Sequence, residues 1–225
     1  MLTAVILFGL LVLFMLAGVF PVQGGMQTVV FYTPVFLLLM AILATLSLAC
    51  CWKKRNIFLK KIGFQLTHLG IIVILAGALT GYLTAKKSEF ALPISSTHEI
   101  KQIPTPDGQS SYDMGFGITV TNFTVDFYEQ TEGRLATTPK HFQASLQITP
   151  NDGPAISHKL EVNHPVEHQG WRFFLMSYDT ESRRYVVLGA RSDPGRKVVF
   201  AGIAMLMLGC TIMCFRKSEG NNATS

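Results

Sequence analysis

Long apolar runs occupy the two ends of the chain and leave a polar stretch between them. The first charged residue is Lys53, and no soluble core helix needs an uncharged segment of that length. Runs that are long and apolar enough to cross a membrane are Leu2–Phe20, Val29–Trp52, Ile62 to about Thr84, and Val198–Phe215. The pattern predicts about four transmembrane helices: three in residues 1–84, and a fourth followed by a tail in residues 196–225.

Residues 85–195 follow a β pattern instead. The segments 117–123 and 142–148 alternate apolar residues with polar or small ones, which is the period of a half-buried strand. Residues 171–176 and 185–188 are apolar at nearly every position, which is typical of strands buried on both faces. We therefore expect a membrane α-helical protein that carries an extracytoplasmic all-β domain, folded as an antiparallel sandwich or small barrel.

The alternation also predicts which side chains form the core of this domain. Every second residue of a strand lies on the same face, so the apolar residues of one parity are expected inside. The expected core contains Phe123, Val125, Leu146, Ile148, Trp171, Phe173 and Leu175.

The distribution of charge predicts the orientation in the membrane. The short loop 53–61 contains five basic residues, whereas the loop that starts at Pro21 contains none. Cytoplasmic loops carry the excess of Lys and Arg. The loop 53–61 and the tail after Arg216 are therefore expected in the cytoplasm, and residues 85–195 outside.

The basic balance of the whole chain does not indicate nucleic-acid binding. Nine of the 19 Lys and Arg residues stand beside the apolar runs, and residues 85–193 contain ten basic against thirteen acidic residues. The basic excess therefore flanks the membrane, and the outer domain is slightly acidic. We expect no nucleic-acid partner.

The cysteines all lie inside or at the end of apolar runs: Cys50, Cys51, Cys210 and Cys214. None lies in the expected outer domain, so no disulfide framework follows. Apolar packing within a span is the simplest interpretation, and the sequence assigns these thiols no function.

One histidine lies where a histidine is costly. His68 is about two turns into the third apolar run, and a polar ring at that depth needs a partner. Two interpretations stay open: the ring is hydrogen-bonded between helices for packing, or one nitrogen ligates haem iron while the other donates to an oxygen. Gly63, Gly70 and Gly77 repeat every seven residues in the same run, and such residues let helices approach closely.

The remaining histidines fall in the expected outer domain: His98, His141, His158, His164 and His168. None forms a metal-type pair on a helix, because Pro165 opposes a continuous helix through His164 and His168. We expect solvated or structural roles for them. The sequence has no nucleophile elbow, no His-Glu-x-x-His and no Gly-rich phosphate loop, so no stand-alone catalytic site is visible.

An ordered set of short motifs closes the outer domain. It consists of Asn163-His164-Pro165, Gly170 before an aromatic strand, Ser177-Tyr178-Asp179, and Asp193-Pro194-Gly195 leading into the last run. Residues 68–78 add the stretch His-Leu-Gly-Ile-Ile-Val-Ile-Leu-Ala-Gly-Ala. With these features the sequence resembles the ResB family of cytochrome c biogenesis proteins over about residues 60–215, and within it the short ResB-like forms.

The resemblance implies a function in the system II pathway of the bacterial cytoplasmic (inner) membrane. There a ResB-type and a CcsA-type protein together form a cytochrome c synthetase, which attaches haem to apocytochrome c outside the membrane. In that family the histidine of this span is taken as a haem ligand, so the resemblance implies that His68 binds haem b transiently, shared with the partner. The partner's tryptophan-rich motif is missing, since only Trp52 and Trp171 occur, and the attachment chemistry is expected on the partner.

Two other functions stay open from the sequence. The chain could be a membrane-anchored assembly scaffold without haem contact, whose outer domain positions its partner. It could also be a subunit of a membrane electron-transfer cytochrome. The presence of a single intramembrane histidine, His68, counts against the last function unless two copies of the chain share their ligands.

Overall fold

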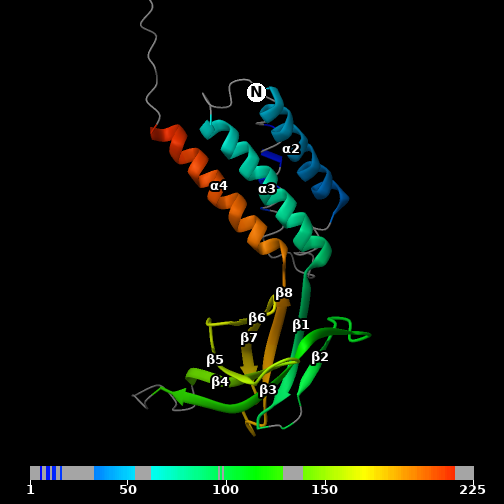
Figure 1. Cartoon of the computed structure of the whole chain (residues 1–225), viewed down its shortest axis with the longest axis vertical. Helices are drawn as coiled ribbons and strands as arrows, with labels where there is room; N and C mark the ends of the chain where they lie inside the picture. Colours follow the sequence, from blue (N-terminus) through cyan, green and yellow to red (C-terminus); the bar gives the residue numbers. More distant parts are fainter. Residues whose placement is uncertain are drawn as a thin grey trace, which may run out of the picture. The chain divides into compact units, whose positions relative to one another are not determined.

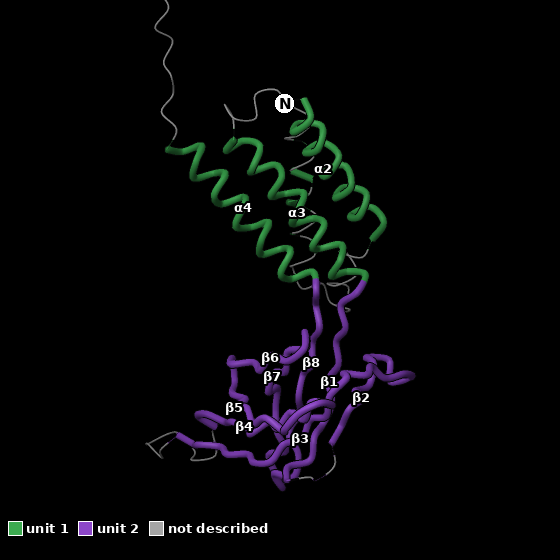
Figure 2. Tube along the Cα trace, in the orientation of Figure 1, with its two compact units in different colours: residues 1–83, 195–225 green, residues 84–194 purple. Residues whose placement is uncertain are grey.

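The chain divides into two compact units, which Figure 2 colours separately. One unit contains residues 1–83 and 195–225, and the other contains residues 84–194. The structure, a computed structural model, describes residues 33–53, 62–128 except 96 and 98, and 139–215, together with six positions between Ile6 and Leu16. Among these residues the first unit is helical and the second is built of strands (Figure 1).

The described part of the first unit holds three helices that are long and apolar enough to cross a membrane: α2 (Pro34–Lys53), α3 (Ile62–Thr84) and α4 (Gly195–Phe215). Their mean hydropathies are 2.5, 2.0 and 2.4. Three of the expected apolar helices are therefore present. The remaining expected span, Leu2–Phe20, lies for the most part outside the described residues, as does the basic loop after Lys53.

The starts of two helices bear on the expected spans. Residues 29–32, where the second expected span starts, lie outside the described residues; the described helix α2 begins at Pro34, and the Thr33 hydroxyl caps it by accepting a hydrogen bond from the Phe36 amide at 3.3 Å. Pro34 is then the first helical residue, a position where its missing N–H costs nothing. The helix α4 begins at Gly195 instead of Val198, directly after the Asp193-Pro194 break.

The second unit contains two four-stranded sheets, of order β1-β8-β7-β6 and β2-β3-β4-β5. The strands are β1 (Lys86–Pro93), β2 (Ile100–Pro104), β3 (Ser111–Phe127), β4 (Pro139–Pro150), β5 (Ile156–Glu161), β6 (Val166–His168), β7 (Trp171–Tyr178) and β8 (Tyr185–Ser192). Every strand pairing within the two sheets is antiparallel. The expected antiparallel β domain is therefore present, with two sheets enclosing one core.

Most of the predicted core residues are buried: Leu146, Ile148, Trp171, Phe173 and Leu175 are at most 6% exposed. Phe123 is half-buried and packs against the core. The prediction for Val125 is wrong, since it is half-buried and lies outside the core cluster. In this part of β3 the described residues provide only β4 as a paired strand, so less of the molecule covers Val125.

The expectation that β7 and β8 are buried on both faces is also wrong. Burial alternates along β7: Phe173 is fully buried, Phe174 is half-buried and Met176 is 55% exposed. One face of this sheet packs on the core, while on the other the Arg172 guanidinium lies 5.3 Å from the Phe174 ring centroid. Apolar residues at successive positions of this strand therefore did not indicate a strand that is buried on both faces.

We expect Trp171→Ala to destabilise the β unit by about 3–5 kcal/mol, because truncating a buried aromatic leaves a cavity. Trp171 is 5% exposed, and its ring centroid lies 6.2 Å from that of Tyr112. The measurement is protease resistance of the full chain over a urea series. Met176→Ala on the same strand is the control, since it removes an exposed side chain. An unchanged midpoint for Trp171→Ala would contradict its place in the core.

The family-like motifs form turns at the corners of this unit. Asn163 has φ 66°, and the His164 amide donates to the Glu161 carbonyl at 3.1 Å, which turns the chain from β5 into β6. Gln169 and Gly170, with φ 44° and 83°, form the two-residue hairpin between β6 and β7. These residues therefore build turns, as the sequence indicates.

Candidate functional site

His68 lies in α3 and makes its hydrogen bond within its own helix. Its Nδ1 is 2.9 Å from the carbonyl oxygen of Phe64, one turn earlier. A carbonyl oxygen only accepts, so Nδ1 carries the proton in this contact. The tautomer with the proton on Nδ1 has its lone pair on Nε2, and in the described residues the ring's hydrogen bond is made by Nδ1. Nε2 is therefore the nitrogen that is free to ligate a metal.

This arrangement fits the requirements of a haem ligand. Histidines that bind metals donate their other ring N–H to a carbonyl, a carboxylate or water, which fixes the tautomer and the ring orientation. The Phe64 carbonyl fills that role for His68. Among the described residues no group of three or more His, Cys, Asp and Glu could hold a metal ion. His68 is then the residue that could hold a haem iron in this part of the chain, through Nε2.

The packing interpretation of His68 expected a hydrogen bond between helices, and in the described residues that bond is made by a neighbour instead. The Gln65 side chain is 3% exposed, and its Nε2 donates to the Cys51 carbonyl of α2 at 3.3 Å. Cys51 is in the last turn of α2, where carbonyls have no partner within the helix. The sequence reasoning missed Gln65, although a glutamine in an apolar run is a detectable signal.

Glycines fix the contact between α3 and α4. A Cβ at Gly70 would lie 2.8 Å from the Leu206 amide nitrogen and 2.9 Å from the Gly202 carbonyl oxygen, which is too close for any real side chain. Gly63 meets Gly209 and Gly77 meets Gly195 in the same way. The seven-residue glycine repeat of α3 thus faces a second seven-residue repeat on α4, which the sequence reasoning missed.

The glycine contact also tells where His68 lies on α3. His68 is two residues from Gly70, which is about 200° around an α-helix. Its side chain is therefore on the side of α3 away from α4. The ring is half-buried, and its centroid lies 4.1 Å from that of Phe64, tilted by 36°.

The histidines of the β unit have separate surroundings. His141 lies 3.7 Å from Glu161, whose carboxylate also pairs with Lys159 at 2.5 Å. The hydrogen bond from Lys159 holds the pKa of Glu161 below its usual value. His168 packs edge-on against Phe116 at 4.7 Å, with Nε2 buried and unpaired in the described residues. His98 lies outside the described residues.

The motif Ser177-Tyr178-Asp179 organises the turn between β7 and β8. The Asp179 carboxylate accepts hydrogen bonds from the backbone amides of residues 181, 182 and 184 at 3.2–3.3 Å. Desolvation raises the pKa of this carboxyl, but the amide donors outweigh it and hold the pKa below its usual value. The Tyr178 ring packs 4.9 Å from Phe123 and 5.2 Å from Phe142. The motif therefore joins this turn to β3 and β4.

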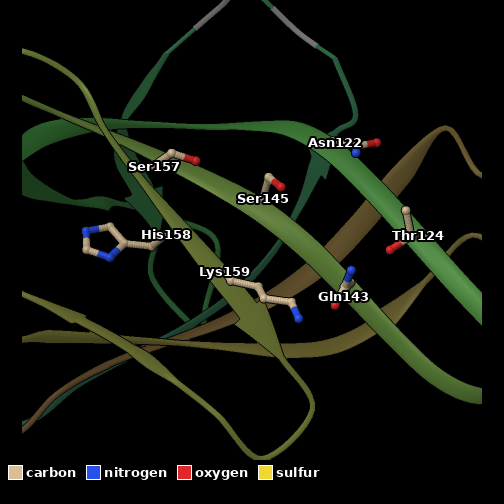
Figure 3. A pocket seen from close by; sticks show the side chains of 7 residues that line it. All are labelled: Asn122, Thr124, Gln143, Ser145, Ser157, His158 and Lys159. Carbon is tan, nitrogen blue, oxygen red and sulfur yellow. The ribbon is translucent and has the colours of Figure 1, made fainter.

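A shallow cavity of about 330 Å³ lies on the sheet formed by β3, β4 and β5 (Figure 3). Its lining is polar throughout: Asn122, Thr124, Gln143, Ser145, Ser157, His158 and Lys159. Haem is a large apolar ring, and haem sites are lined mainly by apolar side chains. This cavity therefore does not fit haem. Amide and hydroxyl side chains suit hydrogen bonds to a polar, uncharged chain such as a polypeptide backbone.

The four cysteines stay without an assigned function. All are free thiols: Cys51 and Cys210 are half-buried, and Cys50 and Cys214 are exposed. They lie on α2 and α4, as their sequence positions indicated.

The comparisons with known proteins identify the family. The ResB-like family model matches residues 58–184, which is more than half of the chain and includes α3 with His68. The chain belongs to the ResB-like family. The resemblance seen in the sequence motifs is therefore confirmed.

Among curated proteins, the chain is similar to the "Cytochrome c biogenesis protein CcsB" of Microcystis aeruginosa (28% identity over 127 residues, 55% of this chain and 27% of the relative). It is similar to the protein of that name from Crocosphaera subtropica (29%, 53% and 26%) and to "Protein NrfI" of Wolinella succinogenes (23%, 48% and 11%). The chain thus spans about a quarter of the length of the CcsB relatives. A solved structure, "Cytochrome c Heme Lyase CcmF", aligns with a TM-score of 0.44 at 11% identity, covering 95% of this chain and 34% of that one.

Proposed function

We propose that this chain is the ResB-type membrane subunit of a system II cytochrome c synthetase. It helps to deliver haem for attachment to apocytochrome c outside the bacterial cytoplasmic membrane. Membership of the ResB-like family and the similarity to proteins named for cytochrome c biogenesis support this function. A CcsA-type partner holds the attachment chemistry.

One observation carries the haem contact: the Nδ1 hydrogen bond of His68 to the Phe64 carbonyl, which leaves the Nε2 lone pair free. In this proposal His68 would hold the iron of haem b within the membrane through Nε2, and a residue of the partner would provide a second ligand. When bound, the haem supplies the vinyl groups at which thioether bonds form. The chain's own residues hold and orient the ligand.

The outer domain is proposed to face apocytochrome c and the partner protein. Its polar cavity supports this assignment, because the amide and hydroxyl side chains suit a polypeptide and not haem. The two ligand chemistries are thus separated along the chain. Haem contact belongs to α3, and polypeptide contact belongs to the sheet of β3, β4 and β5.

Copurification of the chain with a CcsA-type partner tests the proposed function. The expected result is a complex whose absorption spectrum shows bound haem. A stable complex without haem would overturn the haem contact and leave the assembly scaffold as the function. Absence of any complex would overturn the assignment to a two-protein synthetase.

We predict that residues 85–195 lie outside and that the tail after Arg216 lies in the cytoplasm, because the short loop 53–61 is strongly basic. Asp152 is exposed in the turn between β4 and β5 and suits labelling. In a variant whose native cysteines are replaced, Asp152→Cys should react with an impermeant maleimide in intact spheroplasts. Ser218→Cys, the control, should react only after permeabilisation. The reverse pattern would contradict the orientation.

A further inference from the structure

Phe64 contacts the His68 side chain in two ways, through a hydrogen bond and through its ring. Its carbonyl oxygen accepts the Nδ1 hydrogen bond at 2.9 Å. Its ring lies against the imidazole, with the centroids 4.1 Å apart and the planes tilted by 36°. Backbone and side chain of one residue thus act on the same ring.

From these contacts we propose that Phe64 is a positioning residue for His68, which selects the ring nitrogen offered to the iron and limits rotation of the imidazole. The inference rests on the proposed function, because it concerns the ligand that His68 would give to haem. It adds a second residue to that site. Phe64 itself does not touch the iron.

The two contacts restrict different freedoms of the imidazole. The hydrogen bond needs Nδ1 as the donor, so it selects the tautomer whose lone pair is on Nε2. The aromatic ring occupies one face of the imidazole and opposes rotation about the bond from Cβ to the ring, whose torsional minima are broad. Together they aim the Nε2 lone pair in one direction before any iron is bound.

The backbone on which Phe64 lies is itself held in place. The next residue, Gln65, joins α3 to the end of α2 through its hydrogen bond to the Cys51 carbonyl. The hydroxyl of Thr67 donates to the Gly63 carbonyl at 2.9 Å, on the side of α3 that meets α4. Gly63 itself packs on α4, since a Cβ there would lie 2.9 Å from the Gly209 carbonyl oxygen. The turn of α3 that carries Phe64 and His68 thus contacts both α2 and α4, which suits a preorganised ligand.

The tautomer can be tested without haem. In the haem-free full chain with ¹⁵N-labelled histidine, the signal that disappears in His68→Gln should show a protonated Nδ1 and an unprotonated Nε2. A protonated Nε2 would overturn the role of the Phe64 carbonyl. This result does not depend on haem, so its failure is distinguishable from failure of the proposed function.

The role of the ring is tested in the haem-loaded complex with Phe64→Leu, which keeps the carbonyl and removes the aromatic contact. An aromatic pair contributes about 0.5–1.5 kcal/mol, so the ratio of five-coordinate to six-coordinate iron should rise about two- to tenfold. The absorption spectrum and its temperature dependence measure this ratio. Phe64→Tyr should restore the wild-type ratio.

Phe200→Leu is the matched control, because it removes a phenyl ring from α4 that is 61% exposed. It should leave the spin state unchanged. If Phe64→Leu behaves like Phe200→Leu while His68→Ala loses haem, the ligand stands and the positioning role of the ring is overturned. If His68→Ala retains all of its haem, the proposed function is overturned instead.

Discussion

Gly70→Leu should prevent α3 and α4 from packing and lower the midpoint of thermal unfolding in detergent by roughly 5–10 °C. Overpacking costs about 1–3 kcal/mol or more, and each kcal/mol corresponds to about 2–4 °C for a chain of this size. The atoms nearest a Cβ at Gly70 belong to the backbone of α4, which no change of rotamer can move away. The helices would have to separate.

The same reasoning applies at the other glycines, since the contact is reciprocal. A Cβ at Gly202 would lie 2.7 Å from the Ile74 amide nitrogen and 2.9 Å from the Gly70 carbonyl oxygen. Gly202→Leu should therefore be as destabilising as Gly70→Leu. The double variant should cost less than the sum, because the first leucine already separates the helices.

Ala78→Leu is the control for this experiment. Ala78 is exposed on α3, so a leucine there adds volume to the same helix without meeting α4. Fluorescence-detected size exclusion after heating measures all four variants. Equal midpoints for Gly70→Leu and Ala78→Leu would contradict the close contact of the two helices.

The length of the apolar runs predicted the helices, and α3 has the expected bounds. The length of a run does not predict which helices pack against each other. The repeat of Gly63, Gly70 and Gly77 was visible as a small-residue face. Its partner face required the same spacing to be sought on α4, at residues 195, 202 and 209.

The sequence predicted that this unit is an antiparallel β domain, but it did not predict how far the core extends along the strands. Alternation identified the central strands and most of the core, because one face of each sheet packs on the other sheet. It failed at Val125, which alternates correctly but lies where, in the described part of the chain, β4 alone pairs with β3. Strand pattern predicts the face of a residue, and only the neighbouring elements decide how far that face is covered.

At the candidate site, too, the sequence indicated a residue but not its contacts. His68 stood out because a polar ring is costly in an apolar run. Its hydrogen-bond partner could not be identified from sequence, since the acceptor is a backbone carbonyl and every residue has one. The glutamine that joins the helices, Gln65, was detectable by residue type, but its acceptor is again a backbone carbonyl, which no sequence pattern marks.

His68→Ala should weaken haem retention in the copurified complex by at least about tenfold. Removing a hydrogen-bond partner of a metal ligand typically costs about 10–100-fold in affinity, so removing the ligand itself should cost at least as much. The spectrum of the haem that remains should shift from six-coordinate to five-coordinate iron. Maturation of cytochrome c in cells should fall in parallel.

Added imidazole distinguishes a lost ligand from a damaged helix. The alanine leaves a space next to the Phe64 ring, where free imidazole can occupy the position that His68 had beside the iron. Haem content and the six-coordinate spectrum should then return. A helix that had lost its packing would not recover in this way, because imidazole restores no contact within the protein.

His141→Ala is the matched control, since it removes a histidine of the β unit whose side chain is 39% exposed and pairs only weakly with Glu161. It should leave haem content and spectrum unchanged. If His68→Ala also kept both while only the protein yield fell, His68 would be a packing residue. The chain would then act through its outer domain as an assembly scaffold, and haem would be held by the partner alone.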